Sequence, residues 1–286
     1  MLTRQIIETT VRAALVEDAP WGDLTSELLI PETAYATARL VAREPGTFAG
    51  GAVFAAAMTL TDPATQVVIE RADGEEFAAG DTLATVTGPA RSVLQGERVA
   101  LNFTQRMSGI ATLTAAFVRE VDGTPARIVD TRKTTPGLRA FERHAVRAGG
   151  GHNHRYSLSD AVMAKDNHLA VLTAQSGLSV TDALLAVRAQ LSHTTHLEVE
   201  VDRIDQIEPV LAAGVDTIML DNFTLEELRE GVALVAGRAI VEASGNVNLA
   251  TVRAIAETGV DVISSGALTH SVRSLDLGLD VVVEAP

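Results

Sequence analysis

From about Arg127 onward the chain repeats one pattern: a short β-branched run, a polar or glycine turn, and then a helix-like segment. The runs lie at residues 127–133, 161–168, 196–202, 216–222, 239–246 and 260–267. Helix-like segments lie at 180–190, 204–213, 224–235 and 248–258. Alternation of strand and helix at this spacing predicts a parallel sheet with crossover helices. With a further strand at residues 152–156, the pattern predicts an α/β barrel of fewer than eight strands.

Residues 1–107 show a different pattern. A helical segment at 3–18 precedes alternating polar and apolar segments, which predict antiparallel strands joined by glycine turns. A long helix is expected from about Arg91, and Gly109 is expected to mark the break between this domain and the barrel. We therefore predict an N-terminal domain over residues 1–107 and a barrel domain over 108–274. The strand-like tail, 275–286, is expected to return to the first domain.

Charge is distributed unevenly along the chain. The 286 residues include 23 Lys and Arg against 37 Asp and Glu, a net charge of −14. The window 130–168 reverses this balance with seven bases against four acids, and it contains both lysines of the chain, Lys133 and Lys165. A local positive field in a molecule that otherwise repels anions predicts a site for an anionic ligand. The acidic balance argues against nucleic acid as a partner, because phosphate backbones are bound by broad basic surfaces.

The composition excludes several other classes of protein. The chain has no Cys, which rules out disulfides, thiolate metal sites and a cysteine nucleophile. Its longest weakly polar run, residues 49–60, is shorter than the ~20 apolar residues that a membrane span requires. The first 20 residues also lack the apolar core of a signal peptide. We therefore predict a cytoplasmic protein that binds no membrane.

The positions that follow the predicted strands are almost all polar. In a parallel barrel these positions gather on one face, where active sites form. They are Asp130, Thr131, Arg132, Lys133, Lys165, Asp166, Asn167, His168, Glu200, Asp202, Asp221, Asn222, Glu242, Ser244, Ser264 and Ser265. The early strands supply cations, the middle strands carboxylates, and the last two strands Gly and Ser turns, which leave N–H groups free for phosphate. This rim predicts a ligand with a phosphate at one end, anionic groups near the bases, and Mg²⁺ between the carboxylates and ligand oxygens.

Each of these features has a purely structural alternative. The bases after the first barrel strand fit solvated loop charges, and the carboxylates after the middle strands fit surface groups or helix N-caps. Lys165 fits an ion pair with its neighbour Asp166. Arg98 fits the polar face of a helix. His152 and His154 share a face of an extended segment, where a pair of His more often makes orienting hydrogen bonds than binds a metal.

Several motifs together resemble the quinolinate phosphoribosyltransferase family. They are "GDLTS" (22–26), "ERVALNFTQRMSGIAT" (97–112), "DTRKTTPGLR" (130–139), "AVRAGGGHNHRYSLSDAVMAKDNH" (145–168), "EVEVD" (198–202), "LDN" (220–222) and "GALTHS" (266–271). The motifs occur in order over nearly the whole chain, and "TRKTTPG" followed by "KDNH" at this distance is highly specific. The departures from the family pattern are small: Ala148 replaces a common Cys, "MAKDNH" replaces "LIKDNH", and Asn246 replaces a Gly.

The resemblance implies a seven-stranded α/β barrel, an incomplete relative of the eight-stranded form, with an N-terminal α/β sandwich-like domain. It implies a homodimer, or a higher oligomer, that uses Mg²⁺. The reaction would be that of quinolinate with 5-phosphoribosyl-1-pyrophosphate (PRPP) to give nicotinate mononucleotide, pyrophosphate and CO₂ in de novo NAD biosynthesis.

The resemblance also assigns roles to individual residues. The quinolinate carboxylates would contact Arg132, His154, Arg155 and Lys165, with Arg98 entering from the neighbouring subunit. Thr131 and Lys133 would lie in the same site, the lysine nearer PRPP. Glu200 and Asp221 would contact the ribose and the Mg²⁺, and with Lys165 they form the expected catalytic set. The 5′-phosphate would be held by Ser244, Gly245, Asn246, Ser265, Gly266 and Ala267.

Other functions stay open on the sequence. One is a same-fold phosphoribosyltransferase paralogue of unclear substrate, and another is a Schiff-base lyase that uses Lys165. A third is a barrel that binds a ligand without catalysis. The intact set of Arg132, Arg155 and Lys165 favours quinolinate.

Overall fold

The computed structural model describes residues 2–282, and the chain divides into two compact units that are each discontinuous in sequence. The first comprises Met1–Ala115, Thr135–Gly150 and Ser271–Pro286, and the second comprises Ala116–Thr134 and Gly151–His270. The long helix α4 (Ala90–Glu120) continues through Gly109, the position expected to separate the two domains. Glycine serves close packing at this position, because a Cβ would lie 2.2 Å from the carbonyl oxygen of Arg273.

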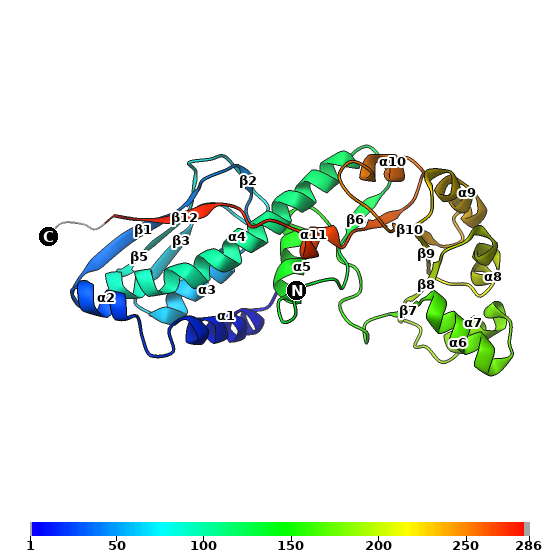
Figure 1. Ribbon diagram of the computed structural model, residues 1–286, viewed down its shortest axis with the longest axis horizontal. Coiled ribbons are helices and arrows are strands. Elements are labelled where there is room, and N and C mark those ends of the chain that lie inside the picture. Colours follow the sequence, from blue (N-terminus) through cyan, green and yellow to red (C-terminus); the bar gives the residue numbers. More distant parts are fainter. Residues whose placement is uncertain (1, 283–286) are drawn as a thin grey trace. The chain divides into compact units, whose positions relative to one another are not determined.

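The first unit is built on an antiparallel sheet with the strand order β12-β1-β5-β3. The strands are β1 (Tyr35–Ala42), β3 (Gln66–Ile69), β5 (Thr82–Pro89) and β12 (Leu277–Val282), the last of which pairs with β1. Every second residue of β1 is buried, as in a sheet with one covered face. Helices α1 (Arg4–Asp18), α3 (Gly51–Thr61) and α4 lie on that same face (Figure 1). The unit also contains α2 (Leu24–Leu29), α5 (Arg139–Ala148) and the short pair β2 (Gly46–Thr47) and β4 (Glu76–Phe77).

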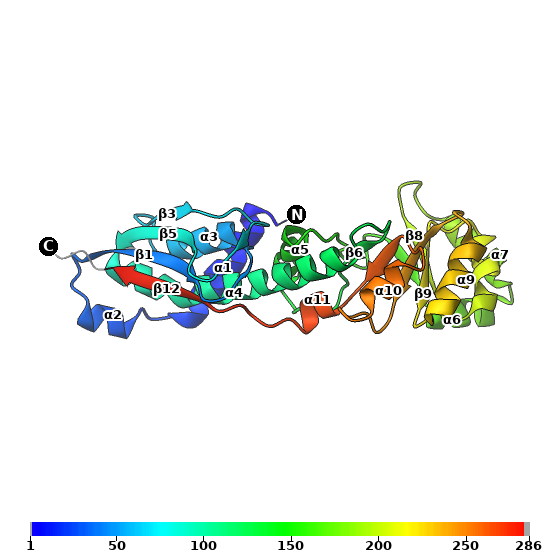
Figure 2. The ribbon, with the colours of Figure 1, turned by 90° about the horizontal axis from the view of Figure 1, so that it is seen from above.

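The second unit contains six parallel strands in the order β6-β11-β10-β9-β8-β7. The strands are β6 (Arg127–Val129), β7 (Val162–Ala164), β8 (Leu197–Val201), β9 (Thr217–Asp221), β10 (Ile240–Ser244) and β11 (Val262–Ser264). The helical elements are α6 (Asp166–Ser176), α7 (Val180–Arg188), η1 (Ile204–Gln206), α8 (Ile207–Leu211), α9 (Leu225–Val235), α10 (Val252–Ala256) and α11 (Ala267–His270). Helices α6, α7 and α9 lie outside the strands (Figure 2). The α/β class and the incomplete barrel are confirmed.

The strand predicted at residues 152–156 is reduced to a single bridge. His152 pairs in parallel with Val129 at the free edge of β6, and residues 153–156 make no ladder. The N–H of His152 donates to the carbonyl of Ile128 (2.8 Å), and the N–H of Asp130 donates to the carbonyl of His152 (3.2 Å). Beyond His152 the segment is held by side chains instead of by a strand neighbour.

The register of the barrel strands sorts their side chains into layers. Alternate residues of a strand share a face, so Glu198 and Glu200 point the same way from β8. Glu198 lies opposite Thr217 on β9, and Glu242 of β10 lies opposite Met219. Most residues of β8, β9 and β10 are buried, as expected for strands covered on both faces.

Within residues 2–282 no one helix combines the length and apolarity that crossing a membrane requires. Helices α6 and α7, bent by 97° at their break, meet that criterion only as a pair, on length and composition alone.

Candidate active site

A cavity of about 570 Å³ lies at the carboxyl ends of the barrel strands. Its lining consists of Thr131, Arg132, Lys133, His154, Arg155, Met163, Lys165, Glu200, Met219, Asp221, Asn222, Glu242, Ser244, Gly245, Asn246 and Ser264. The structure thus brings together the site residues predicted in the second unit except Ser265, Gly266 and Ala267. Arg98 belongs to α4 in the first unit.

The cations of this cavity come from three neighbouring segments. Arg132 and Lys133 follow β6, Arg155 lies in the segment 152–156, and Lys165 follows β7. Burial and the positive charge of Arg132 lower the pKa of Arg155. The two guanidinium groups are therefore close enough to repel each other, and an anionic ligand between them would relieve that repulsion.

Lys165 joins the cationic and carboxylate parts of the cavity. Its Nζ pairs with Oε2 of Glu200 on the next strand. Its backbone N–H donates to Nδ1 of His168 (3.0 Å), which fixes the start of α6. The alternative partner, Asp166, instead accepts a hydrogen bond from the N–H of Asn167 (2.7 Å). The side chain of Lys165 therefore extends from the end of β7 toward the end of β8.

The turn after β10 has a backbone that requires glycine. Gly245 has φ of 96°, and a Cβ there would lie 2.2 Å from Oδ1 of Asn222. Asn246 and Asn222 also adopt positive φ, at 50° and 60°. Two non-glycine residues in the left-handed region at one cavity, Asn222 after β9 and Asn246 after β10, are local strain of the kind found at binding sites.

Two of the predicted phosphate-binding positions in the turn after β11 are engaged within the protein. The N–H of Ser265 donates to the carbonyl of Val129 (3.1 Å), and its hydroxyl donates to the carbonyl of Val247 (3.3 Å). Gly266 packs against Lys133, since a Cβ at Gly266 would lie 2.8 Å from Cδ of that lysine. The phosphate role of this turn stays a prediction.

Three buried polar atoms of the cavity residues have no hydrogen-bond partner in the described part of the chain. They are Nε of Arg132, Oε1 of Glu242 and Oγ of Ser264. Buried polar atoms in proteins are ordinarily paired. Their gathering at one cavity indicates a site that a polar ligand completes.

Below the rim His154 and Glu242 form a cluster with Glu198, a residue for which the sequence predicts no role. Nε2 of His154 lies 3.1 Å from Oε2 of Glu198 and 3.5 Å from Oε2 of Glu242. Burial raises the pKa of Glu198, and the charge of Glu242 adds to this effect, while the hydrogen bond to His154 opposes it. The signal for this cluster was the alternation "EVEVD", which places Glu198 on the same face as Glu200.

The donor atoms of this cluster lie within 4.8 Å of one another, a spacing at which they could hold a metal ion. However, Nδ1 of His154 accepts a hydrogen bond from the N–H of Arg155 (2.7 Å), and this leaves the ring proton on Nε2. A metal ligand needs a lone pair at Nε2 and a proton at Nδ1. Burial alone would lower the pKa of His154, but the two glutamates outweigh burial and raise it. The N–H of Arg155 already occupies Nδ1 and opposes a second ring proton at that nitrogen. The geometry of His154 therefore suits hydrogen bonds to the two glutamates better than it suits a metal ion.

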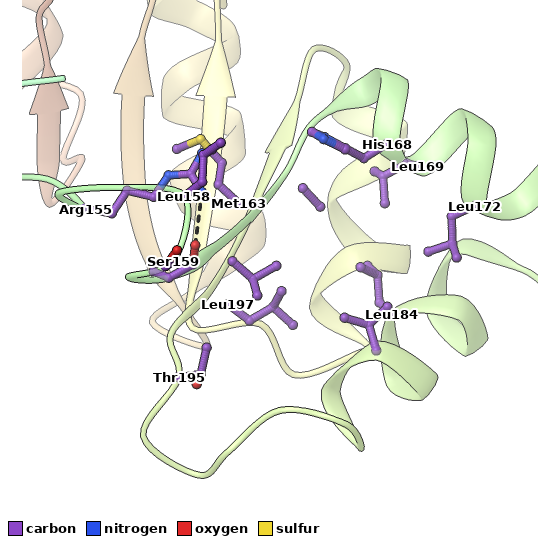
Figure 3. Close-up of a pocket in the computed structure, with 14 residues that line it drawn as sticks. Arg155, Leu158, Ser159, Met163, His168, Leu169, Leu172, Leu184, Thr195 and Leu197 are labelled. Carbon is purple, nitrogen blue, oxygen red and sulfur yellow. Dashed lines mark hydrogen bonds between the residues drawn. The ribbon is translucent and has the colours of Figure 1, made fainter. Parts of the chain in front are cut away.

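A second cavity, of about 480 Å³, adjoins β7, α6 and α7 (Figure 3). Its lining is largely apolar and includes Leu169, Leu172 and Leu184. Arg155 lines both cavities, and its Nη1 donates to the carbonyl of Ala161 (3.0 Å), the dashed line in Figure 3. The guanidinium therefore stands in the wall between an apolar cavity and a charged one.

Comparison with known families decides the identity of this barrel. The N-terminal domain of quinolinate phosphoribosyl transferase matches residues 23–108, and the C-terminal domain of the same enzyme matches residues 110–280. The chain belongs to the quinolinate phosphoribosyltransferase family.

Individual members of the family are similar over nearly their whole length. A nicotinate-nucleotide pyrophosphorylase [carboxylating] of Mycobacterium leprae is 43% identical over 280 residues, which cover 95% of this chain and 96% of the relative. The quinolinate phosphoribosyltransferase [decarboxylating] 1 of Nicotiana glauca is 41% identical, with coverage of 97% and 83%. The crystal structure of NadC from Streptococcus pyogenes superposes with a TM-score of 0.94 at 41% identity, covering 100% of this chain and 99% of NadC.

Proposed function

We propose that this chain transfers the phosphoribosyl group of PRPP to quinolinate with loss of CO₂, forming nicotinate mononucleotide and pyrophosphate. One observation carries the proposal. A single cavity receives Arg132, Arg155 and Lys165 from one arc of the barrel and Glu200 and Asp221 from the next arc. The names of the similar proteins agree with this activity.

The cationic arc suits quinolinate, whose two carboxylates lie on adjacent ring atoms. Arginine forks pair with carboxylates through two parallel hydrogen bonds, while lysine supplies a point charge. A pair of unit charges 4 Å apart contributes about 4 kcal/mol at an effective dielectric near 20. Several bases are needed because the second substrate, PRPP, is also a polyanion.

The carboxylate arc suits the transfer step. The pyridine nitrogen uses its lone pair to attack the anomeric carbon, and pyrophosphate leaves with the electrons of its bond. Positive charge develops on the ribose, where Glu200 and Asp221 would stabilise it. The nitrogen carries no proton, so this step needs no general base. CO₂ then leaves the cationic ring, and the ring carbon keeps the electron pair and takes up one proton.

The carboxylates of Glu200 and Asp221 also fit Mg²⁺, which prefers oxygen ligands and binds to proteins through one or two carboxylates together with substrate phosphates. We propose that these two residues hold it, and that when bound it neutralises charge on the pyrophosphate. A steady-state titration with EDTA and Mg²⁺ tests this point.

We also propose a homodimer in which Arg98 enters the site of the neighbouring subunit. The support is the match of "ERVALNFTQRMSGIAT" to the family. Arg98→Ala and Lys165→Ala would each be inactive, and mixed dimers would regain part of the activity. Mixed dimers with no activity would exclude a shared site.

The assay that tests the reaction compares quinolinate, nicotinate and nicotinamide as acceptors of PRPP. Product from quinolinate alone is expected, whereas turnover of nicotinate without quinolinate would assign the chain to a paralogue. The Schiff-base alternative needs Lys165 to attack a carbonyl group, and the Nζ of Lys165 pairs with Glu200 instead. Borohydride trapping of a carbonyl substrate would detect that alternative.

A further inference from the structure

The segment 152–156 crosses the gap between β6 and β7, and buried side chains hold it there. Asp130, fully buried after β6, receives two hydrogen bonds from this segment. Its Oδ1 accepts from the N–H of His154 (2.9 Å), and its Oδ2 accepts from Nδ2 of Asn153. The carboxylate thus fixes the backbone of the turn to the end of a barrel strand.

His154 continues this chain of contacts through both of its ring nitrogens. Nε2 faces Glu198 on β8 and Glu242 on β10, and Nδ1 accepts the N–H of Arg155. Both nitrogens therefore have partners within the protein. The imidazole connects two strands to the backbone of the residue that follows it.

Arg155 is thereby fixed at two points. The His154 ring holds its backbone N–H, and the carbonyl of Ala161 holds its guanidinium. These anchors oppose the repulsion from Arg132, and the negative charges of Glu198 and Asp160 also favour the charged guanidinium. A pair of arginines can match two adjacent carboxylates only while the separation of the pair is fixed.

We propose that Asp130, Glu198 and Glu242 are positioning residues that act through His154 to set Arg155 against Arg132, and so give the site its preference for a dicarboxylate. The identity of that dicarboxylate as quinolinate rests on the proposed function. The three carboxylates do not need to touch the substrate for this role. They come from β8, from β10 and from the residue that directly follows β6.

The decisive variant is Glu242→Gln, which keeps the size of the side chain and removes its charge. We expect the KM for quinolinate to rise about tenfold, as for other residues that orient a binding group, while kcat and the KM for PRPP change less than about twofold. His154→Gln should produce the same defect, and the double variant should be no worse than either single variant, because both break one path.

Thr217→Val is the matched control. Thr217 is buried opposite Glu198, but its hydroxyl bonds His196 (2.9 Å) and not His154. This variant should lower the melting temperature and leave the KM for quinolinate unchanged. An equal rise of KM in Thr217→Val, or additive losses in the double variant, would show that Glu242 is only a stabilising group.

Direct binding separates this proposal from the proposed function. Phthalate has two adjacent carboxylates and benzoate has one, and calorimetry should show that Glu242→Gln loses most of the preference for phthalate. A wild-type chain without quinolinate turnover would overturn the proposed function, while the phthalate and benzoate titrations would still decide the positioning role. If Glu242→Gln fails to fold, Asp130→Asn carries the same expectations. Unchanged phthalate preference in a folded variant overturns the proposal.

Discussion

Glu200 and Glu198 point into the same barrel from the same strand, yet their surroundings differ in kind. Glu200 lies at the rim with a side chain that is 14% exposed, and it pairs with Lys165, whose side chain is 46% exposed. Glu198 lies one layer deeper and is 4% exposed, and it pairs with His154. The rim places charge where a ligand can meet it, whereas the interior uses charge to hold the protein together. A change at the rim should therefore cost mainly activity, and a change in the interior should cost stability in addition to its effect on the position of Arg155.

The largest expected effect tests the rim. Lys165→Ala removes a charge expected to meet quinolinate, and kcat/KM for quinolinate should fall on the order of 10³-fold, as when one electrostatic contact to a reacting group is lost. The free energy of unfolding should fall by no more than about 1 kcal/mol, because the Lys165–Glu200 pair is partly exposed. Enzyme kinetics and urea unfolding of the same preparation measure both quantities. A loss of several kcal/mol in the free energy of unfolding, with only a modest loss of activity, would show that Lys165 mainly stabilises the fold.

The next effect tests the interior. Glu198→Ala leaves the imidazole of His154 with one carboxylate fewer and opens a polar cavity, so the free energy of unfolding should fall by about 3 kcal/mol. For Glu200→Ala, two residues along the same strand, the free energy of unfolding should fall by only about 1 kcal/mol. Urea unfolding at neutral pH compares the two. Equal losses would mean that depth in the barrel does not separate the roles of these glutamates.

The same difference in depth explains what the sequence could predict. Rim residues such as Lys165 and Asp221 follow apolar runs, so their place at the strand ends can be read directly. Glu198 lies inside a run that a buried strand would fill with apolar residues, and only its contact with His154, 44 positions away, explains its burial. The segment 152–156 was predicted as a strand because its extended pattern resembles one. Its anchors are side chains from distant strands, and no local pattern reveals these partners.

The continuity of α4 through Gly109 has a similar origin. Gly109 is the position at which we predict the boundary between the two domains, and glycine has a low helix propensity. Here the backbone of Arg273, from a distant part of the same chain, approaches so closely that no side chain fits at Gly109. This close packing outweighs the low helix propensity of glycine. Long-range contacts of this kind are absent from a single sequence.

A smaller effect concerns the backbone of the rim. Gly245→Ala forces a Cβ into a left-handed position against Asn222, at a cost of about 1–3 kcal/mol. If the turn after β10 holds the phosphate of PRPP, this cost should appear mainly as a rise in the KM for PRPP of about tenfold, with the KM for quinolinate little changed. Gly237→Ala, also at positive φ but in open space and outside the cavity lining, is the control for strain alone. A similar kinetic defect in both variants would remove the case for a phosphate loop.

The smallest expected effect comes from an exposed ion pair in the first unit. Glu44 accepts hydrogen bonds from Nη1 and Nη2 of Arg273 (2.6 Å each) and from the N–H of Asp276 (2.8 Å), which lower the pKa of Glu44 to about 2. A depressed carboxyl pKa stabilises the folded state above the ordinary value near 4.5, and this contribution is lost as the pH falls toward 2. Arg273→Gln should therefore unfold slightly more easily than the wild type at pH 7, and the difference should shrink below pH 4. Salt should reduce the loss of unfolding free energy caused by Arg273→Gln, because the exposed Glu44–Arg273 pair is screened. It should leave the loss caused by Glu198→Ala nearly unchanged, because Glu198 is buried. Equal sensitivity to salt would show that Glu198 is more accessible to solvent than its burial indicates.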